Sequence, residues 1–501
     1  MFFYCVLANY KVDSLVKDRR FRVRIFARER EVKILEKVYH SKQPEFLAIY
    51  GRRRIGKTFL MRQFFKEKGT YFELTGIKKG SYKHQLHSFI TEFFRVFGKK
   101  PSHKVSNWLE AFDELRTAIE QSAHIGRIIL FFDELPWLAT PKSNFIQALD
   151  HFWNRYMSDD PRIILIVCGS AASWMIKKII CDKGGLHGRL TEKMRLLPFD
   201  LEETEKFLVS RGIMLDRKQL IDIYMAIGGV AKYLTYIEPG QSSLLAVNRI
   251  CFDGPLFKEF DELYSSLFTN YTQHIAVVRA LAGQTCGLTK SQICEKTDIV
   301  FGGGLIDILH ELEESGFINS SASFEKKKND IRFRLIDEYS LFYIKWIEQA
   351  KSVDLKGLDE NYWLKVRNSP VGYAWFGYAF EILCLKHIRK IKEALGISGV
   401  ITRESAWVYK PRADDGKGAQ IDLLIDRADN CINLCEIKYV NDVFTIDKDS
   451  AMQLRSKKNI FIEKTKSKKS IFLTLITPYG VKKNGASLGV VDVELNMDDL
   501  F

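Results

Sequence analysis

A glycine-rich stretch near the N-terminus has the residue types and spacing of a phosphate-binding loop. Residues 47–58 read Leu-Ala-Ile-Tyr-Gly-Arg-Arg-Arg-Ile-Gly-Lys-Thr, so a short apolar run leads into the pattern GxxxxGKT. Glycines at both ends of such a loop let backbone N–H groups turn toward phosphate oxygens, and the N-terminus of the following helix adds partial positive charge. The lysine of this pattern reaches the β- and γ-phosphates, and the hydroxyl group beside it can bind Mg²⁺. The pattern therefore predicts ATP and Mg²⁺ as cofactors, bound by Gly51, Arg52, Arg53, Arg54, Ile55, Gly56, Lys57, Thr58 and Phe59.

The residues around this loop supply the context that the motif requires. The apolar run 46–50 is typical of a buried strand, and the apolar positions Phe59, Leu60, Phe64 and Phe65 predict a helix. A glycine-rich turn that matches by chance would lack a strand before it and a helix after it.

A second acidic element follows another apolar run. Residues 127–134 read Arg-Ile-Ile-Leu-Phe-Phe-Asp-Glu, which suits a strand of a parallel sheet that is covered on both faces. Alone, this would be a strand that ends in an acidic turn. With the phosphate-binding loop, it predicts that Asp133 holds Mg²⁺ through water and that Glu134 orients or deprotonates the attacking water.

Three more residues are candidates for the same site. The apolar strand 162–168 ends at Gly169-Ser170, where Ser170 can sense the γ-phosphate or position the water. Arg189 is a candidate for the arginine that stabilises developing charge, acting within the chain or from a neighbouring subunit of a homo-oligomer; a surface arginine is the alternative. Arg28 precedes a predicted helix at 32–39 and can lie over the adenine, although such a position is more often a solvated helix start.

A second set of charged residues lies near the C-terminus. Residues 420–426 and 432–438 predict two strands joined by a turn at 427–430. The period of two puts Glu436 and Lys438 on one face, and Asp422 on the neighbouring strand can converge with them. Two carboxylates and a lysine can bind a divalent cation, here Asp422 and Glu436, and stabilise water attack on phosphate, although such a group is more often a solvated face. Glu381, near the start of a predicted helix from residue 376, can supply a third acid, and Gln453 is a weaker candidate.

Length and composition set the limits for these sites. A chain of 501 residues predicts about three domains, and its hydrophobic content of 46% allows large cores. The net charge of +14 favours a polyanionic partner, most simply DNA. Nine cysteines without a CxxC pair suggest a reduced, cytoplasmic chain. The apolar first residues are too short to cross a membrane, so we expect a soluble protein.

The middle of the chain is predicted to be mostly helical. Residues 201–270 favour a helical lid with a break at Gly228-Gly229, and residues 272–335 favour three helices and a hairpin, which resembles a winged helix. Its third helix carries four carboxylates, which oppose binding in a groove lined with phosphates: Asp307, Glu311, Glu313 and Glu314. The basic residues are Lys326, Lys327 and Lys328 in the wing. We therefore favour a packing or hinge module over a reader of DNA bases.

The motifs of the N-terminal half resemble a known family. Residues 25–31, the phosphate-binding loop, residues 132–137, Gly188-Arg189 and Gly228-Gly229 resemble the archaeal-type prokaryotic ATPases of the AAA+/STAND superfamily. Two positions depart from that family, because Ala27 replaces a usual glycine and Ala231 replaces a frequent proline.

The C-terminal motif is similar to the PD-(D/E)xK nuclease superfamily and to the nuclease-like domain often fused to these ATPases. Glu381, Asp422, Glu436 and Lys438 match its pattern, which implies that they are catalytic. The expected fold class is α/β. Its expected parts are an N-terminal extension (1–24), a P-loop ATPase core (25–200), a helical lid (201–270), a winged-helix domain (271–350) and a nuclease-like domain (351–501).

Two functions fit these features. The first is an ATP-hydrolysing enzyme coupled to a Mg²⁺-dependent DNA nuclease, in defence against or maintenance of mobile DNA. The second is a nucleotide-controlled, STAND-like switch whose nuclease-like domain mainly binds DNA or a partner. Intact acids at both sites favour the enzyme.

Overall fold

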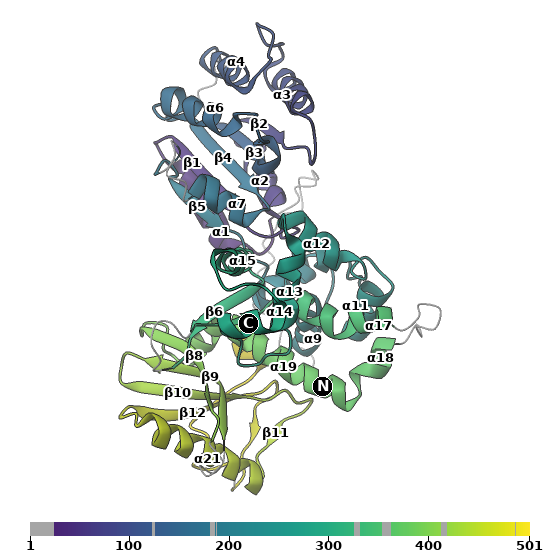
Figure 1. Ribbon diagram of the computed structural model, residues 1–501, viewed down its shortest axis with the longest axis vertical. Helices are drawn as coiled ribbons and strands as arrows, with labels where there is room; N and C mark the ends of the chain where they lie inside the picture. The colour runs from purple at the N-terminus through teal and green to yellow at the C-terminus, as the bar shows by residue number, and fades with distance from the viewer. Residues whose placement is uncertain are drawn as a thin grey trace, which may run out of the picture.

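The computed structural model describes residues 25–122, 126–180, 186, 188–324, 331–352, 362–411, 418–485 and 487–501. Figure 1 shows a sheet covered by helices at one end, a second sheet at the other, and a helical region between them. No described helix is both long enough and apolar enough to span a membrane. The seven described cysteines are all free thiols.

The N-terminal sheet is parallel throughout and has the strand order β2-β3-β4-β1-β5. Its strands are β1 (Glu45–Tyr50), β2 (Thr70–Thr75), β3 (Ile128–Asp133), β4 (Ile163–Gly169) and β5 (Glu192–Arg195). The helices around it are α1 (Glu29–His40), α2 (Lys57–Phe65), α3 (Tyr82–Phe97), α4 (Trp108–Glu120), α5 (Leu135–Leu138), α6 (Phe145–Phe152) and α7 (Ala172–Met175), with π-helical turns η1 (Trp153–Met157) and η2 (Ile176–Ile180).

Alternation along the strands builds two cores on this sheet. Leu47 and Ile49 of β1 pack with α1 and α2, whereas Phe46 and Ala48 pack with α3, α4 and α6. Strands β3 and β4 are buried along their whole length, as the apolar runs predicted. The predicted α/β fold with a parallel sheet is confirmed.

The region between the sheets is helical and shares one large hydrophobic core. That core joins residues of the predicted lid to residues of the middle and C-terminal segments. Its elements are α8 (Leu201–Ser210), α9 (Arg217–Ile227), α10 (Ala231–Leu234), α11 (Ser243–Phe252), α12 (Glu259–Leu267), α13 (Tyr271–Leu281), α14 (Lys290–Thr297), α15 (Gly303–Glu314), β6 (Ile318–Ala322), β7 (Ile331–Leu335), α16 (Glu338–Phe342), η3 (Tyr343–Ile347), α17 (Glu348–Ser352), α18 (Tyr362–Arg367), α19 (Pro370–Lys386) and α20 (Ile388–Ala394).

The predicted order of three helices and a hairpin is present in α13, α14, α15 and the antiparallel pair β6–β7. Helix α15 packs against the N-terminal core, where Lys177 lies 3.2 Å from Glu311 and 3.4 Å from Asp307. Arg195 of β5 binds the C-terminal carbonyls of the same helix. Asp307, Glu311 and Glu314, three of the four acids expected to oppose DNA binding, therefore contact the N-terminal core. The three wing lysines at 326–328 lie outside the described residues.

The C-terminal sheet has the order β14-β12-β10-β9-β8. Strands β8, β9 and β10 are antiparallel neighbours, and β10, β12 and β14 are parallel. The elements are β8 (Thr402–Tyr409), β9 (Ala419–Arg427), β10 (Cys431–Ile437), β11 (Phe444–Thr445), α21 (Lys448–Thr465), β12 (Ser470–Ile476), β13 (Val481–Lys482), β14 (Val493–Leu495) and the 3-10 helix η5 (Met497–Leu500). The predicted hairpin at 427–430 is confirmed.

The prediction that a helix starts near residue 376 was wrong. Helix α19 begins at Pro370, where Ser369 accepts the backbone N–H of Gly372 and proline occupies the first turn. Proline and a serine cap together favour a helix start. Glu381 consequently lies in the second half of the helix.

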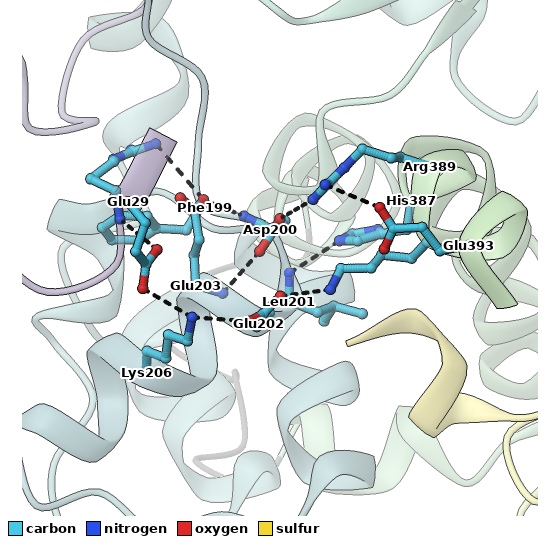
Figure 2. Close-up of polar contacts among 12 residues, drawn as sticks. Glu29, Phe199, Asp200, Leu201, Glu202, Glu203, Lys206, His387, Arg389 and Glu393 are labelled. Carbon is cyan, nitrogen blue, oxygen red and sulfur yellow. Dashed lines mark hydrogen bonds and ion pairs between the residues drawn. The ribbon is translucent and has the colours of Figure 1, made fainter. Parts of the chain in front are cut away.

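A buried histidine joins the lid to the C-terminal segment. His387, between α19 and α20, accepts the backbone N–H of Leu201 at its Nε2 (3.1 Å) and donates from Nδ1 to the carbonyl of Leu383 (2.8 Å). Figure 2 shows His387 and Arg389 facing the start of α8, with Lys206 bridging Glu202 and Glu29 on the other side. Burial lowers the pKa of His387 to about 4, and only a neutral ring can accept the Leu201 N–H.

We expect acid to weaken this junction. Between pH 6.5 and about 4 the unfolded chain binds a proton that folded His387 does not, so stability is lost as the pH falls through this range. In His387→Gln, which keeps an acceptor, the stability loss between pH 7 and pH 5 should shrink, by at most about 1.4 kcal/mol per pH unit. Chemical unfolding at the two pH values measures this, with the exposed His84→Gln as control. Equal pH profiles for wild type and His387→Gln would contradict the assignment.

Candidate functional site

The backbone conformation of the loop between β1 and α2 depends on its two glycines. Gly51 has φ 144° and Gly56 has φ 94°, both in the region that favours glycine. A Cβ atom at Gly51 would collide with the carbonyl oxygen of Leu196, which follows β5. The first helical residue after the loop is Lys57, so the N-terminus of α2 faces the loop. This is the cradle that a phosphate chain requires.

Lys57 lies at the centre of the loop and is 6% exposed. Its ammonium group donates to the carbonyls of Gly51 and Arg52, each at 2.9 Å, and to Ser170 Oγ at 3.3 Å. Burial lowers the pKa of Lys57, while Cys168 and the nearby carboxylates act to raise it. A phosphate anion in the cradle would supply the charge that this buried cation otherwise lacks.

The predicted magnesium and water-activating residues converge on the same point. Thr58 Oγ1 donates to Asp133 Oδ2 at 2.7 Å, at the end of β3. Glu134 follows with φ 48° and accepts the hydroxyl of Ser170 at 2.6 Å. The structure thus brings Lys57, the acids and the serine together, and their donor types fit ATP with a hydrated Mg²⁺.

Two of the loop arginines point away from this cradle. Arg52 is buried and forms an ion pair with Asp337, and its guanidinium lies 4.7 Å from the centre of the Phe317 ring. Arg54 pairs with Glu259 of α12 and lies 4.0 Å from Glu262. Their side chains therefore hold the loop against other parts of the chain. Arg53 is half-buried, and Phe59 is 48% exposed on the first turn of α2.

Arg28 forms a hydrogen bond with the backbone of the loop. Its guanidinium donates to the carbonyl of Ile55 at 3.2 Å and stacks on Phe199, 4.2 Å from the ring centre. Burial lowers the pKa of Arg28, opposed by Glu203 and Glu31, each 3.8 Å away. The preceding Ala27 has φ 52°, in the left-handed region that favours glycine.

Arg189 is not part of the loop site within the chain. Its side chain is exposed, and Thr191, two residues later, donates its backbone N–H to Phe46 at the start of β1. The phosphate-binding loop follows the other end of β1. Of the predicted possibilities, this geometry leaves action on a neighbouring subunit and the alternative of a surface arginine.

The C-terminal acids converge as the hairpin register requires. The β9–β10 register ends at Cys435 opposite Leu423, so Glu436 and Asp422 come next on the two strands. Lys438 lies 2.8 Å from Glu436. Burial and the neighbouring Asp422 raise the pKa of Glu381 to about 8, and burial and Glu436 raise the pKa of Asp422. These four residues therefore form one electrostatic cluster, named the acid centre below.

Sequence reasoning missed a fifth residue, which contacts the acid centre. Lys457 of α21 donates to both oxygens of Glu436, at 2.8 and 2.7 Å. It lies one helical turn after Gln453, whose side chain is exposed. Among the described residues no group of three or more His, Cys, Asp or Glu is placed to hold a metal ion. A two-carboxylate site on Asp422 and Glu436 fits a hydrated Mg²⁺ only if Lys457 moves aside.

Comparisons with known proteins match the N-terminal half to a family. The family described as an ATPase domain predominantly from Archaea matches residues 25–237. An uncharacterized protein of Methanocaldococcus jannaschii, MJECL04, is 23% identical over 407 residues, which span 79% of this chain and 83% of that protein.

Solved structures with similar folds include two archaeal proteins. The Walker-type ATPase PABY2304 of Pyrococcus abyssi has a TM-score of 0.45 at 18% identity and covers 66% of this chain and 99% of its own. The ORC2 protein of Aeropyrum pernix has a TM-score of 0.40 at 17% identity and covers 68% and 100%. The family match and the geometry of the loop agree. Residues 25–237 thus match an archaeal-type ATPase domain in sequence, and the loop within them has the geometry that binds a phosphate chain.

Proposed function

We propose that the protein is an ATPase that controls a Mg²⁺-dependent nuclease centre and acts on DNA. The observation that carries this proposal is a continuous set of buried contacts between the phosphate-binding loop and the helix of the acid centre. Each site alone is compatible with many functions, but the contacts give each a way to affect the other.

At the ATPase site, the chain's own residues position the nucleotide and the water. Lys57 neutralises the β- and γ-phosphates, and Thr58 and Asp133 hold hydrated Mg²⁺. Glu134 accepts the proton of the attacking water, and the hydrogen bond from Ser170 Oγ (2.6 Å) fixes its orientation. ATP supplies the phosphoryl group whose transfer drives the change in the rest of the chain.

At the acid centre, Asp422 and Glu436 would hold Mg²⁺ once Lys457 moves aside, since this ion commonly binds one or two carboxylates and keeps several waters. Lys438 stabilises charge that builds on the scissile phosphate. Glu381, whose pKa is about 8, holds a proton at neutral pH and can exchange it with the water or the leaving group. The net charge of +14 supports a DNA substrate.

The contacts between the sites run through three consecutive steps. Arg52 of the loop pairs with Asp337, which caps α16 by accepting the backbone N–H of Ser340 at 3.0 Å. The next residue, Glu338, binds Lys386 at 2.7 and 2.8 Å. Lys386 lies on α19, the helix that carries Glu381. A change of the loop on ATP binding can therefore reach α19 through charged groups that are too buried to separate without cost.

The second candidate is a switch in which hydrolysis is slow and the C-terminal domain mainly binds DNA or a partner. The ion pair between Lys457 and Glu436 favours this second candidate. The lysine occupies the carboxylate oxygens that would otherwise bind the metal ion. Cleavage of linear, branched and single-stranded DNA in Mg²⁺, with and without ATP, separates the two functions. Cleavage under any of these conditions supports the enzyme.

Glu134→Gln should keep ATP bound but stall its hydrolysis. The amide can still accept from Ser170, but it cannot take a proton, so the rate should fall about a hundredfold or more. Phosphate release and equilibrium binding of labelled ATP measure the two effects. Lys57→Ala is the comparison, because it should lose ATP affinity as well. Full turnover by Glu134→Gln would show that another residue activates the water.

Asp422→Asn should abolish DNA cleavage and weaken Mn²⁺ binding, while ATP hydrolysis remains. The substitution keeps the shape of the side chain and removes the charge that attracts the ion. Asp426→Asn is the matched control, because Asp426 lies on the same strand and pairs with Lys469. Unchanged cleavage and Mn²⁺ affinity in folded Asp422→Asn would rule out this carboxylate as a metal ligand.

Asp337→Asn should abolish the coupling between the ATP-binding loop and the acid centre. Asparagine can still cap α16 but removes the charge opposite Arg52, so the loop loses its hold on this helix. Hydrogen exchange across α19 should respond to ATP in the wild type and not in the variant. Glu262→Gln is the control, since Glu262 is an exposed acid near Arg54. An ATP response that persists in Asp337→Asn would exclude this route of coupling.

A further inference from the structure

A basic cleft lies between the N-terminal sheet and the middle segment. It has a volume of about 620 Å³ and lies at the carboxyl ends of β2, β3 and β4, which are neighbours in the sheet. The loops after these strands form one wall, and residues of α12, α13 and α15 form the other. Ligands of open α/β sheets commonly bind at this edge. Neither the phosphate-binding loop nor the acid centre contributes a residue to the cleft.

Three lysines of the cleft have no opposite charge bound to them within the described part of the chain. Lys78 and Lys79 follow β2, and Lys178 follows β4. All three side chains are exposed, and none makes an ion pair or hydrogen bond with a described residue. The two carboxylates that line the cleft both pair with a fourth lysine, Lys177. The remaining positive charge favours a polyanionic ligand.

Two tryptophans line the same wall as these lysines. Each of the other six tryptophans of the chain contacts another aromatic ring. No described aromatic ring contacts Trp137 or Trp174, and both are partly exposed where they line the cleft. Sites for single-stranded nucleic acid combine these two features, because bases stack on aromatic side chains while cations follow the phosphates.

A buried side chain holds this wall in shape. Gln85 of α3 accepts the backbone N–H of Ile77 at 3.1 Å and donates to the carbonyls of Ile77 (2.9 Å) and Trp137 (3.2 Å). The loop of Lys78 is thereby fixed to the turn that carries the first indole. Trp137 also donates its backbone N–H to the carbonyl of Glu134 at 2.9 Å. The wall is therefore preformed, and it adjoins the residue proposed to activate water.

We propose that this cleft binds single-stranded DNA. Lys78, Lys79 and Lys178 bind the phosphates, and the indoles of Trp137 and Trp174 stack on bases. The volume suits a short stretch of one strand rather than a duplex. The assignment deepens the proposed function and rests on DNA being the ligand. It gives the ATPase domain its own contact with DNA, next to the ATP site and apart from the acid centre.

The test is binding of fluorescein-labelled oligothymidylate to the full-length protein, in EDTA so that the DNA is not cleaved. Fluorescence anisotropy gives the affinity at several salt concentrations. The double variant Lys78→Gln, Lys79→Gln should bind about tenfold more weakly, because two phosphates lose their cations. The slope of log affinity against log salt should fall by roughly 1.4, the value for two contacts on a single strand.

The double variant Lys99→Gln, Lys100→Gln is the matched control. These two adjacent lysines are also exposed, but they follow the other end of α3 and do not line the cleft. The control removes the same charge from the same domain, so it separates a local contact from an effect of net charge. It should bind the oligonucleotide as the wild type does.

Trp137→Leu tests the stacking. It should weaken binding about tenfold and leave the salt slope unchanged, because it removes an aromatic surface and no charge. Trp137→Phe keeps a ring and should recover part of the affinity. Thermal unfolding checks that each variant is folded. If Trp137→Leu does not fold, Trp174→Leu takes its place with the same expected results. Unchanged affinity in the folded variant would contradict base stacking in the cleft.

The outcomes distinguish this assignment from the nuclease proposal. Equal affinity and salt slope for the wild type and the Lys78, Lys79 variant overturn the cleft as a DNA site, even if the wild type cleaves DNA. An equal loss in the Lys99, Lys100 control, no binding by the wild type, or tighter binding of a duplex of the same length overturns it too. If the Lys78, Lys79 variant alone weakens binding and the wild type never cleaves DNA, the cleft remains a DNA site and the nuclease proposal fails.

Discussion

The buried ion pair between Arg52 and Asp337 is the constraint on which the arrangement of the chain depends. Burial alone would lower the pKa of Arg52, but Asp337 raises it above the ordinary value, so the guanidinium stays charged inside the protein. Two of its nitrogens, Nε and Nη2, have no hydrogen-bond partner among the described residues, so Asp337 is its principal compensation. Removing one partner of such a pair typically costs about 3–5 kcal/mol. The phosphate-binding loop and α16 therefore hold their relative position strongly.

This constraint places the middle segment between two sites. On one side, α15 meets the ATPase core through Lys177, Arg195 and the carboxylates of the helix. On the other, the β6–β7 hairpin packs on the C-terminal sheet through Phe324. Asp337 follows β7 by two residues, so one short stretch of chain contacts both the loop and the helix of Glu381. Rigid connections of this kind can transmit a local change over a long distance.

The acid centre shows how the protein keeps close carboxylates stable. Two of them have a raised pKa because they are buried beside one another, and Glu436 is neutralised by Lys438 and Lys457. Like charges brought together in this way require cations or protons. The net charge of the cluster therefore changes when a lysine moves away or a ligand binds. Many catalytic sites share this property.

The sequence by itself determined the parts of the protein whose chemistry is local. The GxxxxGKT loop, the strand that ends at Asp133 and Glu134, and the β9–β10 hairpin are set by spacing within about a dozen residues. Glycine conformations, a helix start and the period of a strand decide them. The structure accordingly shows the predicted loop, the predicted strand end and the hairpin that brings Asp422, Glu436 and Lys438 together. The strand order of the parallel sheet then brings the loop, Asp133, Glu134 and Ser170 to one edge.

Only the tertiary structure decided where the long charged side chains find their partners. Arg52 and Arg54 belong to the loop motif, yet their side chains bind Asp337 and Glu259, which are more than 200 positions away in the sequence. Arg189 lies near the start of β1, away from the loop, and Lys457 of α21 reaches Glu436. No spacing rule predicts these contacts, because a charge is satisfied by whichever opposite group the packing of distant segments brings within reach.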